Sequence, residues 1–108
     1  MDLFGLKGRV AVVTGASSGL GADAARAYAA YGADVALVAR RKERLESLAE
    51  ELRREGVKAL PVACDVSRED DVRAAVERIM DYFERVDILL NDAGVAGGGG
   101  GGGGSRAG

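Results

Sequence analysis

The sequence predicts an α/β fold organised on a parallel sheet. Short runs rich in valine and leucine alternate with longer segments whose apolar residues recur at helical spacing. One of the runs, Asp34 to Ala39, is apolar on both faces, as expected for a strand that is covered on both sides. Strands that alternate with helices are typical of a parallel sheet with right-handed crossovers.

The first strand and the first helix enclose a glycine-rich turn. Residues 9–13, R-V-A-V-V, predict a buried strand, and residues 14–21, T-G-A-S-S-G-L-G, follow it directly. The next helix is predicted over 20–31 and ends at Gly32, a favourable residue after a helix C-terminus. Its apolar residues at helical spacing are Leu20, Ala24, Ala27, Tyr28 and Tyr31.

The glycines of this turn have separate predicted roles. Gly15 permits the tight turn, Gly19 allows a pyrophosphate to approach the backbone, and Gly21 allows the helix to pack close to the strand. Free N–H groups at the helix start would face the anion, aided by the helix dipole. The turn therefore predicts a phosphate-binding loop, with a purely structural turn as the alternative.

The second strand, 34–39, leads into a helix predicted over 42–55 and ended by Gly56. Charged residues take the outer side of this helix, and its predicted buried stripe consists of Leu45, Leu48, Ala49 and Leu52.

The third strand is predicted over 58–63, where Pro61 favours an edge position. Ser67, with Asp70 three residues on, is similar to a capping box and predicts the start of a helix that runs to about residue 83. The predicted apolar face of that helix consists of Val72, Val76, Ile79, Met80 and Phe83.

A fourth strand is predicted over 87–91, D-I-L-L-N. A doubly wound sheet built from these elements has strand order 3-2-1-4, with the first two helices on one face and the third on the other. One face is then under-covered, and the fourth strand is an open edge. We therefore expect marginal stability, or association with a second copy or a partner through that edge or face.

Composition limits the function classes. The chain has 108 residues, enough for one domain, and is 47% hydrophobic, enough for a core. Its net charge of −2, with both signs interspersed, predicts neither a nucleic acid nor an anionic membrane as partner. The sequence also lacks an apolar run of about 18 residues, so no membrane span is expected.

Cysteine and histidine usage adds two expectations. Cys64 is the one cysteine, and the start of the chain lacks a signal-peptide pattern, so a reducing cytoplasm is the expected compartment. Histidine is absent, which removes Ser-His-Asp and Cys-His catalysis and most zinc sites.

The helix–strand pattern stops before residues 97–104, which are all glycine. Such a tract behaves as flexible coil, so we expect a domain over 1–96 and a disordered glycine-rich tail over 97–108. A linker, a truncation scar or a sequence error would each account for the tract, and a functional glycine loop is the alternative.

The glycine spacing distinguishes between nucleotide-binding loops. The triphosphate loop G-x-x-x-x-G-K-[ST] does not fit, because Leu20 stands five residues after Gly15, and G-x-G-x-x-G is also absent. The spacing T-G-x-x-x-G-x-G after a first strand resembles the short-chain dehydrogenase/reductase family. The resemblance implies a Rossmann-like fold and an oxidoreductase that transfers hydride between NADP(H) and a carbonyl or alcohol. The loop residues implied in cofactor binding are Gly15, Ser17, Ser18, Gly19, Leu20 and Gly21.

The end of the second strand indicates which cofactor is preferred. NAD-preferring members of the family carry an acidic residue at the position of Ala39, and here Arg40 and Arg41 follow it. A guanidinium pairs with the 2′-phosphate of NADP, whereas a carboxylate would repel it. The resemblance thus implies NADP rather than NAD, with Arg40 and Arg41 in cofactor binding. The alternative is that both arginines simply begin a solvated helix.

Two further segments are similar to family motifs. Asp65 and Val66 match a D-[VL] pair that holds the adenine ring. Asn91, Ala93 and Gly94 match three positions of N-N-A-G, which lines the cofactor ribose. Asp92 departs from that motif, and we expect its added negative charge either to weaken cofactor binding or to disturb the neighbours of the strand.

The catalytic motif of the family, Y-x-x-x-K with a serine, is not found. The residue four positions after Tyr28 is glycine, and the residue four positions after Tyr31 and Tyr82 is valine. The resemblance covers roughly residues 5–96, the cofactor-binding half of such an enzyme, so the chain is incomplete relative to the family. Two readings follow: a truncated short-chain oxidoreductase that is inactive alone, or a non-catalytic nucleotide-binding or interaction fragment.

Overall fold

The computed structural model describes residues 5–17 and 19–91. The predicted boundary at residue 97 and the glycine tract lie outside these ranges. The strands are β1 (Val10–Thr14), β2 (Asp34–Ala39), β3 (Ala59–Ala63) and β4 (Ile88–Asn91). The helices are α1 (Gly19–Ala30), α2 (Lys42–Arg53) and α3 (Glu69–Phe83).

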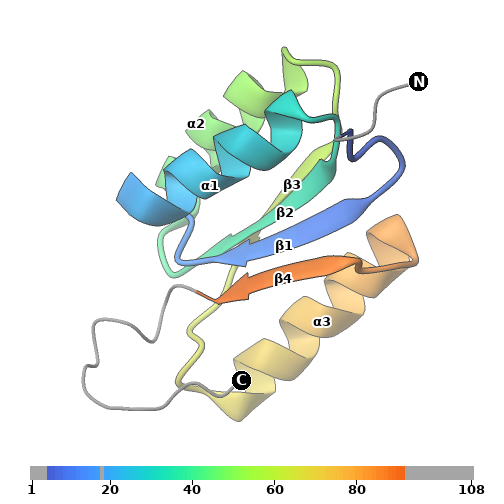
Figure 1. Ribbon diagram of the computed structural model, residues 1–108. Helices are drawn as coiled ribbons and strands as arrows, with labels where there is room; N and C mark the ends of the chain where they lie inside the picture. Colours follow the sequence, from blue (N-terminus) through green and yellow to red (C-terminus); the bar gives the residue numbers. More distant parts are fainter. Residues whose placement is uncertain (1–4, 18, 92–108) are drawn as a thin grey trace.

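The strands form one parallel sheet in the order β3-β2-β1-β4, which confirms the predicted fold class and strand order. Figure 1 shows α1 and α2 together on one face of the sheet and α3 on the other, also as predicted. Pro61 lies in β3 at one edge. Within the described residues β4 pairs with β1 alone and forms the other edge.

The predicted helix ends were too long by one or two residues. Helix α1 ends at Ala30, and Gly32 follows with a φ of 98°. Helix α2 ends at Arg53, before Gly56 with a φ of 95°. In both cases the chain has left the helix before the glycine, which adopts the left-handed conformation that reverses the chain direction.

The side of α1 that faces the sheet differs from the prediction. Leu20 is 74% exposed and Tyr31 is 54% exposed, whereas Gly21, Ala25 and Ala29 are buried. Small side chains let this helix lie close to the sheet, so its buried residues are glycine and alanine. Of the larger predicted residues, Tyr28 is partly buried and packs against the core. The predicted stripe of α2 is confirmed, because all of its members are buried: Leu45, Leu48, Ala49 and Leu52.

Helix α3 uses only part of its predicted apolar face. Ile79 is 4% exposed and packs with the smaller Ala75 against the sheet, and Phe83 is partly buried. Val76 is 53% exposed, Met80 is 42% exposed and Val72 is 37% exposed, so the described residues leave part of the predicted apolar face uncovered. The described residues provide α3 with the sheet as its packing surface, and a single flat contact buries a narrow stripe of a helix.

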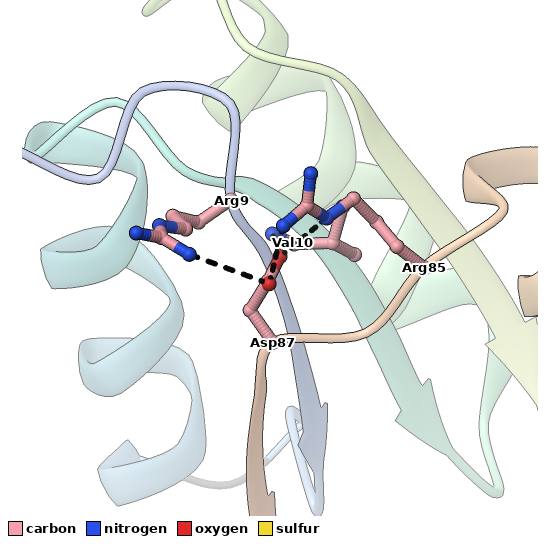
Figure 2. A network of polar contacts seen from close by, with 4 residues as sticks. All are labelled: Arg9, Val10, Arg85 and Asp87. Atoms are coloured by element: carbon pink, nitrogen blue, oxygen red, sulfur yellow. Dashed lines mark hydrogen bonds and ion pairs between the residues drawn. The ribbon is translucent and has the colours of Figure 1, made fainter.

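Strand β4 is held at its start by a polar network around Asp87 (Figure 2). The Val10 N–H donates to Asp87 Oδ2 at 2.8 Å, and the Asp87 N–H donates to the Val10 carbonyl at 2.8 Å. Arg85 donates to both carboxylate oxygens, at 2.7 and 3.0 Å, and Arg9 lies 3.7 Å from Oδ1. The Arg85 guanidinium, with the Val10 N–H and Arg9, lowers the pKa of Asp87. The ionised carboxylate therefore fixes the register in which β4 joins β1.

Candidate functional site

The carboxyl ends of the parallel strands meet at one edge of the sheet, where Thr14, Ala39, Ala63 and Asn91 end their strands. In open parallel sheets ligands bind in the crevice outside these ends, where the chain leaves for helices on opposite faces. Here β1 leads to α1 on one face, and neighbouring β4 is reached from α3 on the other (Figure 1). The predicted site residues on the described part of the chain all lie in the segments that follow or end these strands.

The glycine loop is fixed by close backbone contacts. Gly15 has a φ of 72°, which accounts for the tight turn after β1. The Ala16 N–H donates to the Val38 carbonyl at 3.2 Å, so the loop lies across the end of β2. A Cβ on Gly21 would collide with the carbonyl oxygen of Gly15 and lie 2.8 Å from its carbon. Only glycine at position 21 allows α1 to begin so close to the loop.

Gly19 begins α1 in a different environment. A Cβ at this position would have no heavy atom within 4 Å apart from its chain neighbours and the backbone of its own helix, so the space beside it is open. Leu20 is exposed and Ser17 is partly buried. Backbone N–H groups in the first turn of a helix lack intrahelical acceptors and favour an anion. Ser18 lies outside the described residues.

The end of β4 is tied to the glycine loop by side chains. Thr14 Oγ1 lies 2.8 Å from Asn91 Oδ1 and 3.3 Å from the Leu90 carbonyl, both at hydrogen-bonding distance. The contact joins the first residue of the T-G-x-x-x-G-x-G motif to the first residue of N-D-A-G. The role of Thr14 was not predicted, although its position as the first residue of the motif was the available signal. Ala93, Gly94 and Asp92 lie outside the described residues.

The segment after β2 supplies positive charge. Ala39 is buried at the end of the strand, and the two residues that follow it, Arg40 and Arg41, are exposed. The positive charge of Arg40 is one of the causes that lower the pKa of the Asp65 carboxyl. Arg40 and Asp65 thus follow the ends of β2 and β3, which are neighbours in the sheet.

Asp65 organises the turn that follows β3. Its Oδ1 accepts from the Ser67 hydroxyl at 2.6 Å and from the Ser67 N–H at 3.0 Å. These hydrogen bonds are the main reason that the pKa of Asp65 is lowered. The predicted capping role of Ser67 was therefore wrong, because its hydroxyl is engaged by Asp65 and Arg68 is the residue that precedes α3. Val66 is 44% exposed beside this turn.

Cys64 lies directly before Asp65 and is buried. Burial, with Asp71 and Asp65 nearby, raises the pKa of its thiol. A thiol that stays protonated is a poor nucleophile and metal ligand, so Cys64 serves packing. Within residues 5–17 and 19–91 there is no group of three His, Cys, Asp or Glu side chains that could hold a metal ion.

A cavity of about 260 Å³ opens beside the glycine loop, between α1 and α2. No pattern in the sequence had predicted this cavity. Arg44, Ser47 and Glu51 of α2 line it at spacings that place them on one side of the helix. This polar stripe next to the apolar one was the signal in the sequence. The full lining is Ala16, Ser17, Ala22, Arg26, Arg44, Ser47, Leu48 and Glu51.

Comparison with known proteins identifies the family. Residues 9–103 match the family described as short chain dehydrogenase. The chain belongs to this family. A short chain dehydrogenase of Pseudocercospora fijiensis is 45% identical over 91 residues, which are 84% of this chain and 29% of that protein.

Solved structures of a reductase and a dehydrogenase share the fold. L-sorbose reductase of Gluconobacter frateurii, complexed with NADPH and L-sorbose, is similar with a TM-score of 0.80 and 45% identity over 87% of this chain and 36% of that one. An NAD⁺-bound xylitol dehydrogenase is similar with a TM-score of 0.75 and 33% identity over 78% of this chain and 32% of that one. The chain therefore spans about a third of the length of these relatives.

None of the helices in residues 5–17 and 19–91 combines the length and apolar character needed to cross a bilayer.

Proposed function

We propose that this short-chain dehydrogenase chain binds a nicotinamide dinucleotide, NADP in preference to NAD, at the carboxyl edge of its sheet. In the proposal it is the cofactor-binding part of an oxidoreductase. The observation that carries the proposal is the loop geometry. Gly21 is in contact with Gly15, while the space beside Gly19 is open at the start of α1.

In this proposal the glycine loop binds the pyrophosphate. The first N–H groups of α1 face the phosphate oxygens, and the open space at Gly19 lets the anion approach the backbone. Ser17, Ser18 and Leu20 complete the loop. Because the contact is made largely by backbone groups, it depends on the conformation of the loop more than on the identity of its side chains.

Arg40 and Arg41 supply the preference for NADP. Both are exposed after the buried Ala39, and no carboxylate occupies the position of Ala39. We propose that Arg40 pairs with the 2′-phosphate, and that Asp65 and Val66 hold the adenine. Relatives bound to NADPH and to NAD⁺ share this fold, so the preference rests on the arginines.

Asn91, Ala93 and Gly94 line the ribose on the nicotinamide side in this proposal. Thr14 orients the side chain of Asn91 through the 2.8 Å contact, so the end of β4 and the glycine loop hold the cofactor from two sides. When bound, the cofactor supplies the hydride for reduction of a carbonyl or accepts one from an alcohol. The one cysteine, Cys64, is buried and reduced, which fits a proposed cytoplasmic location.

The binding proposal is tested by the fluorescence of NADPH titrated with the 108-residue chain and with Gly19→Val. The open space at Gly19 lets the variant fold, which far-ultraviolet circular dichroism checks, while its side chain occupies the proposed phosphate position. We expect enhancement with the wild type and loss of it in the variant. Equal enhancement in both proteins, or none in the wild type, would contradict the proposal.

A second candidate function, association through β4, is favoured by one observation. Leu89 is 67% exposed on this edge strand. An open edge with an exposed apolar side chain is a surface that pairs with another strand. We propose a second copy of the chain or a partner polypeptide as the occupant.

A further inference from the structure

The cavity between α1 and α2 is next to the proposed cofactor site but is built by different residues. Ser17 lines it from the glycine loop, and Arg44 and Ser47 line it from α2. Arg44 lies in the first turn of α2, three residues after Arg41. Arg44, which lines the cavity, is therefore within one helical turn of Arg41, a residue of the proposed 2′-phosphate site.

The two arginines that line the cavity, Arg26 and Arg44, differ in whether they pair with carboxylates. Arg26 is engaged by Glu51, at 2.7 and 3.3 Å, and by Asp23 at 3.1 Å. Arg44 forms no hydrogen bond or ion pair with any residue of the ranges 5–17 and 19–91. One guanidinium is thus neutralised within the cavity wall, and the other is available to an anion.

The position of Arg44 opposes helix stability. A cation in the first turn faces the positive end of the helix dipole, where an acidic residue would be favoured. Neutralising it should therefore leave the fold at least as stable. An unpaired, locally unfavourable cation beside a proposed anion site is consistent with a role in ligand binding.

We propose that Arg44 is a specificity-determining residue that contacts the 2′-phosphate of NADP from the α2 side of the cavity, opposite Ser17. The inference rests on the proposed function, in which the dinucleotide occupies the carboxyl edge of the sheet. It adds a contact beyond Arg40 and Arg41. Arg44 acts on NADP alone, because NAD has a hydroxyl where NADP has the phosphate.

The test is calorimetric titration of the 108-residue chain with NADP⁺ and with NAD⁺, comparing the wild type with Arg44→Gln, Arg44→Lys and Arg54→Gln. Arg54 is a matched control because it is an exposed arginine just after the opposite end of α2. Thermal melts of all four proteins establish that each is folded before titration.

We expect Arg44→Gln to weaken NADP⁺ binding about two- to fivefold, the range for a charge contact that solvent partly screens, and to leave NAD⁺ binding unchanged. Arg44→Lys should recover part of the loss, since it keeps the charge without the guanidinium fork. Arg54→Gln should bind as the wild type does.

The outcomes separate the inference from the proposed function. A wild type that binds NADP⁺ more tightly than NAD⁺, with the same preference in Arg44→Gln, contradicts the role of Arg44 alone. A wild type that binds neither cofactor contradicts the proposed function and the inference with it. An equal loss of NADP⁺ affinity in Arg44→Gln and Arg54→Gln would show that only the net charge of the chain matters. That result would also overturn the role of Arg44.

Discussion

Asp87 and Val10 exchange two hydrogen bonds, each 2.8 Å long, although they are separated by 77 positions in the sequence. The pair sets the register of β4 on β1, in which Ala11 is opposite Ile88 and Thr14 is opposite Asn91. One end of the strand is thus fixed by Asp87, and the other end presents Asn91 to the glycine loop. The position of Asn91, a proposed ribose contact at the carboxyl end of β4, therefore depends on the Asp87 carboxylate at the start of the same strand.

Asp87→Asn should lower the thermal midpoint at pH 7 and flatten its pH dependence in acid. The pKa of Asp87 is lowered in the folded protein, chiefly by Arg85. Its stabilising effect is therefore present above the ordinary carboxyl pKa of about 3.9 and is lost as the pH falls through the lower folded value. Thermal melts from pH 7 to pH 2.5 would show the two proteins converging at the acid end.

The matched control is Asp81→Asn, an exposed carboxylate on α3. It should keep the full acid dependence of the wild type. Asp65 and Glu51, whose pKa values are also lowered, titrate in all of these proteins and leave a residual slope. An identical decline for Asp87→Asn and the wild type would show that Asp87 does not contribute to the stability of the fold.

Gly21→Ala and Gly19→Ala should separate folding from binding. The alanine at 21 would collide with the carbonyl of Gly15, so we expect destabilisation of about 1–3 kcal/mol. The alanine at 19 meets open space and gains helix propensity, so its stability should be within about 1 kcal/mol of the wild type. Urea unfolding measures both, and a large loss in Gly19→Ala would contradict the geometry of the loop.

The fold could be predicted from the sequence because short sequence patterns specify its turns, strands and helices. The glycines at 15, 32 and 56 mark turns by their backbone conformation, and the alternation of strands and helices restricts the topology. The stripe of α2 followed from its spacing. The face of α1 did not, because the choice between Ala25 and Tyr31 depends on how closely the helix approaches the sheet, which is a tertiary property.

Residues of the candidate site could be predicted only where they belong to a recognisable sequence motif. Gly15, Gly19 and Gly21 stand in a recognisable spacing, and Arg40 follows a strand end. The contact of Thr14 with Asn91 and the network of Asp87 join residues that are distant in the sequence, and no local pattern specifies such pairs. Ser67 was misassigned because a serine before a helix can bond backward to an aspartate as well as forward to the helix.

Leu89→Lys should reduce self-association of the chain. Leu89 lies opposite Val12 in the register, on the α3 side of the sheet, and a lysine on an edge strand discourages pairing. We expect light scattering to show concentration-dependent dimers or larger species for the wild type and a smaller fraction for the variant. Tyr31→Lys, on the opposite layer, is the control and should associate as the wild type does. A monomeric wild type at all concentrations would contradict this prediction.

The purified 108-residue chain should not oxidise NADPH with ketones or aldehydes. Hydride transfer leaves negative charge on the carbonyl oxygen, which a positioned acid must neutralise. No histidine is present, and no tyrosine has a lysine four residues later. The assay follows NADPH absorbance with a carbonyl panel, and Gly15→Val/Gly19→Val reveals contaminating reductases. Turnover by the wild type that disappears in this double variant would show that another residue acts as the acid.

The most direct measurement of the central claim is calorimetric titration of the chain with NADP⁺ and NAD⁺, alongside Arg40→Ala. A hydrogen bond to a charged phosphate contributes roughly 1.5–3 kcal/mol, so NADP⁺ should bind about ten- to a hundredfold more tightly than NAD⁺. The substitution should remove most of that difference and leave NAD⁺ binding unchanged. Equal affinities for the two cofactors that are also unaffected by Arg40→Ala would contradict the assignment of this site to NADP.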